Sequence, residues 1–541
     1  MSLKSVKSLL LLCILLFAGN GGVQAQNDLF WGDLQPGRYD VGFRTLYQMD
    51  YTRLYDTTFP TLAKPNEHKP FRPLLIAVWY PAKKTGAERM VFKDYLSIES
   101  KDPKVAAFSQ RLKTRLDMIA RQEFITYRPV AEWKAEETAA WDKIVATRAY
   151  SVKNAAPAQG RFPLVIYHPG IGGGYEDNFA LFEYLASHGY VVISSAYQAE
   201  DAAVPFINWE LPRSFKDLTL LLQYAKTLPN VDAERLAVMG QSFGGQAVFG
   251  WRAETNSPVE ALVSFDSGME TANEEEFATG YKPLKAQFEA SAEVNTDSVI
   301  TPILCFGSAE DKPKFEMLDK YLKFAPRYKA ITTSLKHNDY VTHGAVQGAF
   351  FSRKEEGTAG GKLRRESYDN VCRHVLAFFD FTLKRDAAGG AYLKQSLKES
   401  RAEGKFTLRY QAPAALPPTA GQLTHIIEKQ GVAAAEMVLR QCRNDLSPTS
   451  LYLPIQLLMD ADKKENFLRL NNLCMELLPN SAFAYEQRAK FHEKYGEKEK
   501  AIAAYQKALE LIPADPIFLK YESSRKYVLD EWTKALAKLK P

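Results

Sequence analysis

The chain has 541 residues, of which 46% are hydrophobic and 25% charged, and its formal net charge is +5 at pH 7. That length predicts two or three globular domains, and the composition is typical of folded proteins. Without Lys4 and Lys7, which lie in the leader expected below, the charge is +3, and the other basic residues are scattered. This balance excludes a strongly basic surface, so we expect no nucleic-acid partner.

The first 25 residues have the pattern of a secretory signal peptide. Two lysines precede an apolar run at residues 9–18, and small residues end at Ala25, which are the features of a cleavable leader. The run is about half as long as the ~20 residues that span a bilayer. We therefore expect a signal peptide at residues 1–25, a periplasmic or secreted protein, and no membrane span in the mature chain. An uncleaved anchor is the alternative.

Four cysteines follow the leader: Cys305, Cys372, Cys442 and Cys474. An oxidising compartment permits disulfides, but this wide spacing matches neither a metal site nor a compact disulfide framework. We predict buried free thiols, and we expect no metal and no organic cofactor.

Residues 27–100 are predicted to form strands and turns. Residues 37–45 alternate apolar and polar side chains, as a half-buried strand does, and residues 74–80 form an apolar strand that Pro81 ends. Residues 101–150 are charged and have a helical pattern. We interpret them either as a helical cap or as helices that pack on the rest of the domain.

From residue 162 onward, short apolar strands alternate with helical segments. The strands are expected at 162–168, 190–196, 236–239, 261–265, 303–306 and 328–335, and the helices at 179–188, 214–228 and 372–383. This alternation predicts a mostly parallel central sheet flanked by helices. We expect residues 27–410 to form one catalytic domain of this kind.

A G-x-S-x-G motif stands at residues 240–244, between an apolar strand and a helical segment. In the nucleophile elbow of the α/β-hydrolase fold, such a turn presents the serine on strained backbone, here Ser242. Gly240 and Gly244 are then required because side chains there would collide with neighbouring backbone. The alternative is a glycine-rich turn without chemistry.

A serine hydroxyl needs a histidine base and a carboxylate that orients the base, and in this fold both follow the serine in the chain. His337 stands in the loop after the last predicted strand, so it is our candidate base; His343 on the same loop is the second choice. Asp266 and Asp311 each follow a strand before His337. The order of the residues does not choose between these two acids.

Two backbone amides are needed to bind the oxyanion. One belongs to Phe243, the residue after the nucleophile. The other should come from the glycine-rich segment 168–174, where we choose Ile171, with Gly170 next. A phosphate-binding role for this segment is disfavoured, since no Lys-Ser/Thr pair follows it.

The chain resembles the plasma-type platelet-activating-factor acetylhydrolases, a branch of the α/β-hydrolases, over residues 35–385. The segments that carry the resemblance are Gly37-Arg-Tyr-Asp-Val-Gly, Val78-Trp-Tyr-Pro, Pro163-Leu-Val-Ile-Tyr, Leu185-Ala-Ser-His-Gly-Tyr, residues 231–245 and the His337 loop.

The resemblance implies that the acid is Asp266, because in that family it follows the strand after the elbow. Asp311 would fit the related dienelactone hydrolases instead. The chain departs from the family at Gln241, where the family usually has histidine, and at His168-Pro-Gly-Ile-Gly, where the family has Ser-His-Gly-Leu-Gly.

Residues 411–420 are rich in proline and alanine and are expected to be a linker. In the helical region 421–541, the segment 482–513 has the spacing of a tetratricopeptide repeat, with weaker copies before it. The positions that match are Tyr485, Gly496, Ala501, Tyr505, Ala508 and Pro513. We expect a small all-α repeat domain that could bind a protein partner.

Together these features predict a serine hydrolase that cleaves carboxylic esters through an acyl-enzyme. By resemblance, the substrate is a small-molecule or lipid ester with a short acyl group, such as a phospholipid ester. One alternative is a peptidase or amidase that uses the same triad. Another is a scaffold protein, in which the repeats bind a partner and the hydrolase domain is a relic.

Overall fold

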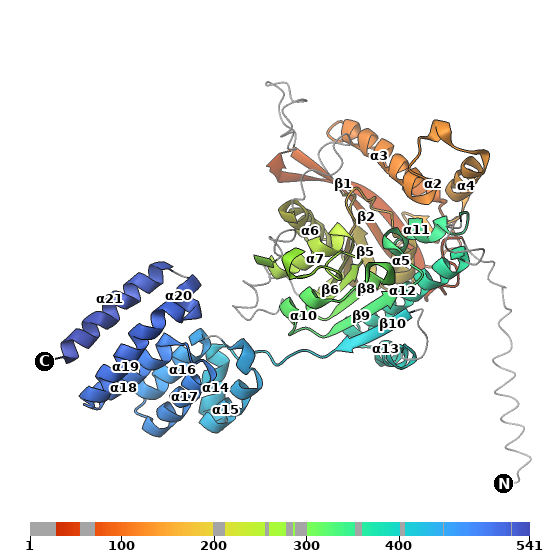
Figure 1. Ribbon diagram of the computed structural model, residues 1–541. Helices are drawn as coiled ribbons and strands as arrows, with labels where there is room; N and C mark the ends of the chain where they lie inside the picture. The colour runs from red at the N-terminus through yellow and green to blue at the C-terminus, as the bar shows by residue number, and fades with distance from the viewer. Residues whose placement is uncertain are drawn as a thin grey trace, which may run out of the picture. The chain divides into compact units, whose positions relative to one another are not determined.

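The computed structural model describes residues 29–54, 71–197, 211–254, 259–276, 285–286, 300–351, 360–400, 406–446, 448–520 and 522–540. The expected leader lies outside these residues. The chain forms two compact units (Figure 1): the first comprises Met1–Gln287, Thr301–Lys320 and Pro326–Gln411, and the second comprises Phe288–Ile300, Tyr321–Ala325 and Ala412–Pro541.

The first unit contains a ten-stranded sheet. In spatial order its strands are β10 (Phe406–Gln411), β9 (Arg327–Thr332), β8 (Ile303–Ser308), β7 (Val259–Phe265), β6 (Val231–Gln241), β4 (Phe162–His168), β5 (Val191–Ser194), β2 (Phe71–Ala82), β1 (Asp40–Leu54) and β3 (Ser151–Lys153). The six strands from β9 to β5 are parallel, whereas β2 runs antiparallel to both of its neighbours and β10 runs antiparallel to β9.

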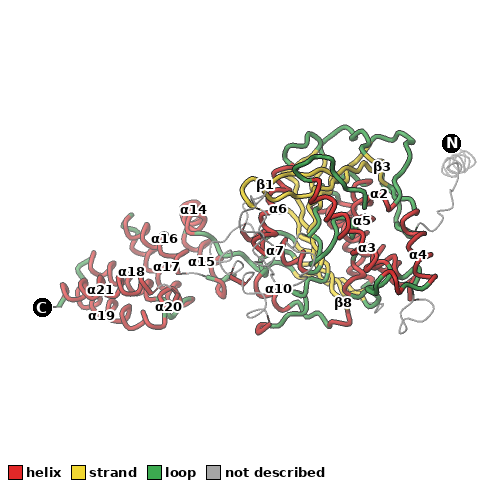
Figure 2. The backbone as a smooth tube through the Cα atoms, turned by 90° about the horizontal axis from the view of Figure 1, so that it is seen from above, coloured by secondary structure: helices red, strands yellow, loops and turns green. Residues whose placement is uncertain are grey.

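Helices cover both faces of this sheet, which Figure 2 shows as a band of strands between helices. One layer contains α5 (Phe179–Ser187), α11 (Thr342–Gln347) and α12 (Gly360–Thr382); the other contains α6 (Leu211–Ala225) and α7 (Phe243–Glu254). All seven residues of β4 are buried, because a central parallel strand is covered on both sides. The unit therefore has the α/β-hydrolase fold, as the sequence predicts.

The described residues of this unit also form α2 (Phe92–Tyr95), α3 (Ala106–Phe124), α4 (Ala135–Ala146), α10 (Glu316–Tyr321) and α13 (Ala387–Glu399). Of these, α3 and α4 lie in the region 101–150 interpreted as a cap or as packing helices. In α3, residues Phe108, Leu112, Leu116 and Phe124 recur on one face and belong to the main hydrophobic core. The helical character of this region is confirmed; its action as a lid stays a prediction.

The edge strand β10 was not expected from the sequence. It pairs with β9 from Phe406 opposite Thr332 to Gln411 opposite Arg327, so the expected linker begins at the last residue of this strand. Residues 406–411 alternate apolar with polar side chains, and this is the signal from which the strand could have been found.

The second unit is helical in its described residues. Its helices are α14 (Ala420–Gln430), α15 (Val432–Gln441), α16 (Pro448–Asp460), α17 (Lys464–Leu477), α18 (Ala482–Lys494), α19 (Lys498–Leu511), α20 (Pro516–Lys520) and α21 (Glu522–Leu539). Consecutive helices pack in pairs, and neighbouring pairs pack on one another. Ala501, Tyr505 and Ala508 are buried there, as apolar repeat positions should be. Their assignment to tetratricopeptide repeats stays a prediction.

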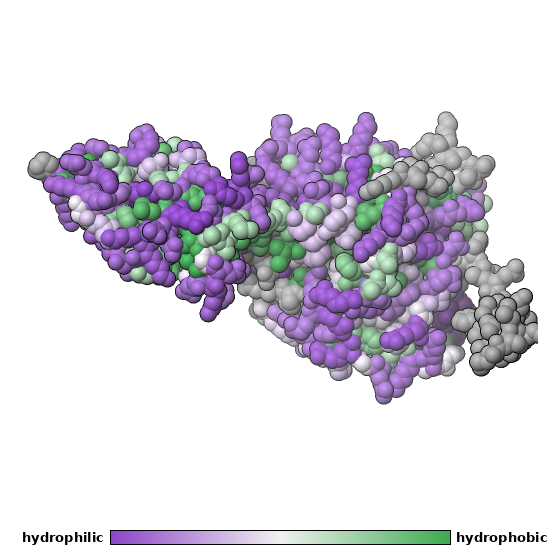
Figure 3. Space-filling model, turned by 90° about the horizontal axis from the view of Figure 1, so that it is seen from below, coloured by the Kyte–Doolittle hydropathy of each residue, from purple (hydrophilic) through white to green (hydrophobic). Residues whose placement is uncertain are grey.

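The surface of both units is largely hydrophilic on the face that Figure 3 shows. No helix in the described part of the chain is long and apolar enough to cross a membrane. Cys305, Cys372, Cys442 and Cys474 are buried and free, which confirms the sequence prediction for these thiols.

A buried carboxylate on α6 connects the outer strands to the rest of the first unit. Asp217 accepts hydrogen bonds from Arg53 of β1 at 2.6 Å and from Arg72 of β2 at 2.9 Å. We expect Asp217→Ala to lower the free energy of unfolding by about 3 kcal/mol, because it removes a carboxylate that bonds the buried Arg72 and, together with Asp50, the partly buried Arg53.

Thermal and urea unfolding of the full chain would measure this change. The matched control is Glu531→Ala, whose partner Lys534 is exposed and which should leave the unfolding curve in place. Equal behaviour of the two variants would contradict the expectation.

Candidate active site

Ser242 lies in a sharp turn between β6 and α7. β6 ends at Gln241, α7 begins at Phe243, and the serine between them has a left-handed φ of 55°. A Cβ added to Gly240 would overlap the backbone of Gly244, and one added to Gly244 would overlap the carbonyl of His168. Both positions therefore require glycine.

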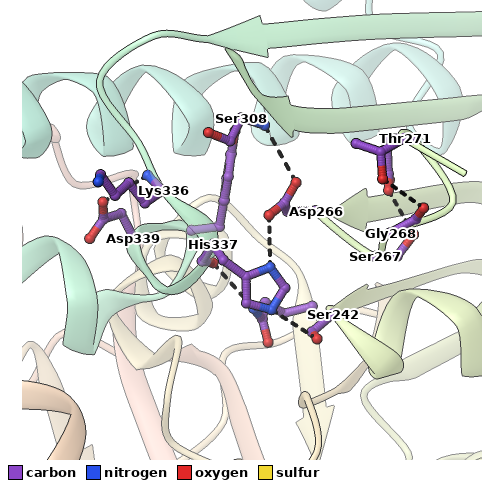
Figure 4. A network of polar contacts seen from close by, with 12 residues as sticks. Ser242, Asp266, Ser267, Gly268, Thr271, Ser308, Lys336, His337 and Asp339 are labelled. Atoms are coloured by element: carbon purple, nitrogen blue, oxygen red, sulfur yellow. Dashed lines mark hydrogen bonds and ion pairs between the residues drawn. The ribbon is translucent and has the colours of Figure 1, made fainter. Parts of the chain in front are cut away.

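Two hydrogen bonds link Ser242 through His337 to Asp266 (Figure 4). The Ser242 hydroxyl lies 3.0 Å from His337 Nε2, and His337 Nδ1 lies 2.7 Å from Asp266 Oδ2. His337 begins the short 3-10 helix η4 (His337–Tyr340) after β9, and Asp266 directly follows β7. With Nδ1 donating to the carboxylate, Nε2 is free to accept the serine proton, which is the arrangement of a Ser-His-Asp triad.

The backbone at Asp266 is fixed by its neighbours in the sheet. Its φ is 51°, its side chain is buried, and its amide donates to the carbonyl of Phe306 at 2.8 Å. The second carboxylate oxygen, Oδ1, accepts from the amide of Ser308 at 3.4 Å. The carboxylate is thus held on one side by β8 and on the other by His337.

The imidazole of His337 is electrostatically prepared to act as a base. The hydrogen bond that His337 donates to the Asp266 carboxylate raises the pKa of His337, and partial burial opposes this rise. Its side chain is 49% exposed, so a substrate can reach it. A raised pKa strengthens the imidazole as a proton acceptor and favours the imidazolium that forms when the serine attacks.

The structure brings Asp266, rather than Asp311, to the histidine. Asp311 ends the short helix η3 (Ala309–Asp311) with an exposed side chain. Its pKa is raised, first by partial desolvation and then by the nearby Asp266 carboxylate. Since His337 Nδ1 already bonds Asp266, Asp311 lies outside the triad in this arrangement.

The second-choice base, His343, is placed in the core. It lies on α11 with a fully buried side chain, and its Nδ1 bonds Glu123 Oε2 at 2.7 Å. The rings of Phe92 and Phe124 pack against it. Its surroundings are those of a packing residue.

The glycine-rich loop lies beside the nucleophile. It turns tightly at residues 170–173, where the Gly173 amide donates to the Gly170 carbonyl at 3.0 Å. A Cβ added to Gly170 would lie 3.2 Å from Ser242 Cβ, so the backbone that carries Ile171 is next to the serine. Phe243 contributes the first amide of α7. The donation of these two amides to an oxyanion stays a prediction.

Gln241 connects the base to the glycine-rich loop. Its Nε2 lies 3.3 Å from the carbonyl oxygen of His337 and 3.4 Å from His337 Nε2. A Cβ at Gly170 would collide with its Oε1. In the sequence, Gln241 stands out only as a departure from the family. Its contact with His337 could be found only in the folded structure, because 96 residues separate the two.

The described residues contain no group of three or more His, Cys, Asp or Glu side chains arranged to hold a metal ion.

No family model matches the chain, and neither does any curated protein. Among solved structures, it is similar to a ferulic acid esterase from Streptomyces cinnamoneus. The two are 19% identical over 65% of this chain and 93% of that chain, with a TM-score of 0.43. A similarity of this size says nothing about the substrate of this chain.

Comparing Asp266→Asn with Asp311→Asn tests which acid serves the triad. We expect Asp266→Asn to lower kcat by about 10⁴-fold, because the imidazole loses the group that fixes its tautomer and stabilises its charge. Asp311→Asn should stay within about threefold of wild type, as a change outside the triad does. Hydrolysis of an activated acetate ester would give both values, and the reverse ranking would assign the acid to Asp311.

Proposed function

We propose that the protein is a serine hydrolase that cleaves carboxylic esters. The observation that carries this proposal is the pair of hydrogen bonds that joins Ser242, His337 and Asp266. These residues come from three separate loops at one edge of the sheet, and the nucleophile stands on left-handed backbone. Such backbone persists at a non-glycine residue only where the surrounding structure fixes it.

The reaction follows from the positions of the three side chains. His337 Nε2 takes the hydroxyl proton while Ser242 Oγ bonds to the ester carbonyl carbon, and the amides of Phe243 and Ile171 bind the oxyanion. The imidazolium then gives its proton to the leaving alcohol as the ester C–O bond breaks. Water, deprotonated by the same imidazole, attacks the acyl-enzyme. The acid is released and the proton returns to Ser242.

The finer parts of the proposal rest on the sequence. The resemblance to platelet-activating-factor acetylhydrolases favours a substrate with a short acyl group, such as a phospholipid ester. The leader favours a periplasmic or secreted enzyme, and the helical repeats favour a protein partner for the second unit.

The proposal is tested directly by labelling with a fluorophosphonate probe. We expect one equivalent to react with the wild-type chain and none with Ser242→Ala, because only an activated serine attacks phosphorus at neutral pH. Intact-mass spectrometry gives the stoichiometry. Ser308→Ala removes the hydroxyl of a buried serine at the end of β8 but keeps the backbone amide that bonds Asp266, so it controls for a general effect of losing a hydroxyl. Equal labelling of wild type and Ser242→Ala would refute the assignment.

A panel of p-nitrophenyl esters of increasing chain length, set against aminoacyl amides, would separate an esterase from an amidase. We expect the highest kcat/KM for the acetate or propionate ester. Faster cleavage of the amides would replace the ester assignment while leaving the triad in place.

The pH dependence of kcat/KM should have an acid limb with a midpoint above 6.5. The base must be neutral to accept the serine proton, and the hydrogen bond that it donates to Asp266 raises the pKa of His337 above its ordinary value of 6.5. Activity is therefore lost as the pH falls through this raised pKa. A midpoint below 6.5 would contradict the electrostatic role given to Asp266.

A further inference from the structure

The loop that carries Asp266 contains two left-handed residues within three positions. Asp266 has a φ of 51° and Gly268 a φ of 82°. A non-glycine residue in this region is disfavoured by roughly 1–3 kcal/mol and persists only where the surroundings fix it. Part of the fixing must come from contacts other than the bond to His337, whose own side chain is 49% exposed.

The side chain of Glu270 provides such contacts. It is fully buried, with Oε1 accepting from the Ser264 hydroxyl at 2.6 Å and Oε2 accepting from the Ser267 hydroxyl at 2.9 Å. Ser264 lies in β7, two residues before Asp266, and Ser267 follows Asp266 directly. One carboxylate therefore holds the chain on both sides of the acid.

Glu270 is itself anchored through its backbone. Its carbonyl oxygen accepts from the amides of Lys314 at 3.0 Å and Phe315 at 2.9 Å. These residues follow β8, the next strand of the sheet. The carboxylate is thus attached to a segment outside the loop that it restrains.

The same group of contacts reaches the nucleophile's helix. A Cβ added to Gly245 on the first turn of α7 would lie 2.6 Å from Ser267 Cβ and 2.8 Å from Ser264 Oγ. The Gln246 side chain, one residue on, donates to the Ser267 carbonyl at 2.8 Å. The two serines held by Glu270 therefore pack on the helix that begins immediately after Ser242.

We propose that Glu270 is a positioning residue of this site: through Ser264 and Ser267 it fixes the Asp266 loop against the nucleophile's helix, in the orientation that receives His337. The inference rests on the proposed function, since it assigns Glu270 a role in the same triad. It predicts that loss of these bonds loosens the His337–Asp266 contact without removing either residue.

The charges around Glu270 determine how its variants must be compared. Its carboxyl group interacts electrostatically with Asp266 on its own loop, Cys305 on β8, and His337 and Tyr340 on η4. Burial raises the pKa of Glu270 to about 7, so its charge changes near neutral pH. Removing that charge lowers the pKa of His337 by itself. Glu270→Ala and Glu270→Gln remove it equally, but only glutamine can still bond both hydroxyls.

The first measurement is turnover. We expect Glu270→Ala to lower kcat on the order of tenfold to a hundredfold, as a small displacement of a catalytic group does, with KM nearly unchanged because substrate binding is not involved. Glu270→Gln should restore kcat to within a few-fold of wild type. The matched control is Glu183→Ala, which removes another fully buried carboxylate, one bonded to Trp31, Tyr95 and Ser151. It should lower thermal stability but leave kcat in place below the unfolding transition.

The second measurement does not depend on turnover. Diethyl pyrocarbonate modifies neutral imidazole, so the pH dependence of His337 modification, followed by mass spectrometry of its peptide, reports the pKa of His337. We expect the midpoint to fall further in Glu270→Ala than in Glu270→Gln, because only the alanine variant loosens the bond between His337 and Asp266. Ser267→Ala, which removes one of the two bonds, should lie between wild type and Glu270→Ala. If Glu270→Ala does not fold, Ser267→Ala takes its place in this comparison.

Equal midpoints in the alanine and glutamine variants, or a folded Glu270→Ala with wild-type kcat, would overturn the positioning role. Equal losses of kcat in Glu270→Ala and Glu183→Ala would also overturn it, because they would show general destabilisation. Failure of the proposed function looks different: the wild-type chain would then neither hydrolyse esters nor react with the fluorophosphonate, whatever the His337 midpoints are.

Discussion

Two neighbouring parallel strands end in register, and the candidate site is built on this constraint. Gln241 of β6 pairs with Phe265 of β7, and the next residue of each strand, Ser242 and Asp266, has left-handed backbone. The Ser242 amide donates to the Phe265 carbonyl at 2.9 Å, so the two turns leave the sheet at the same level. Because Ser242 and Asp266 leave the sheet side by side, a single position of the His337 imidazole after β9 allows it to bond both side chains.

Left-handed backbone at two such residues opposes folding by roughly 1–3 kcal/mol each. At Ser242 the surrounding glycines permit it, because Gly240 and Gly244 let the strand, the helix and the glycine-rich loop approach without side chains between them. At Asp266 hydrogen bonds offset this cost. They are the bond from the Asp266 amide to β8 and the bonds of Glu270 with the adjacent serines. The same geometry that is unfavourable locally thus places the hydroxyl, imidazole and carboxylate in line.

Two more buried acids lie against the glycine-rich loop, where a negative charge would oppose a developing oxyanion. A Cβ at Gly174 would lie 2.5 Å from Glu176 Oε2, and one at Gly173 would lie 3.0 Å from Asp177 Oδ2. Burial raises the pKa of Glu176 to about 8 and raises the pKa of Asp177 well above its ordinary value. Burial therefore favours the neutral form of Glu176 near pH 7, and it shifts the pKa of Asp177 in the same direction. Burial thus reduces the negative charge that these two carboxyl groups place beside the loop.

The sequence by itself determined the α/β fold, the strand-to-helix turn at Ser242 and the loop that carries His337, because apolar periodicity and glycine spacing are local properties. The order of the residues left Asp266 and Asp311 as alternatives, since both follow strands and precede the histidine, and only the family resemblance favoured Asp266. The sequence also missed β10, Glu270 and the contact of Gln241 with the base. Only the tertiary structure decided these points: strand register and side-chain burial arise when segments about 70 to 100 residues apart pack together, and no local pattern encodes which carboxylate then faces the imidazole.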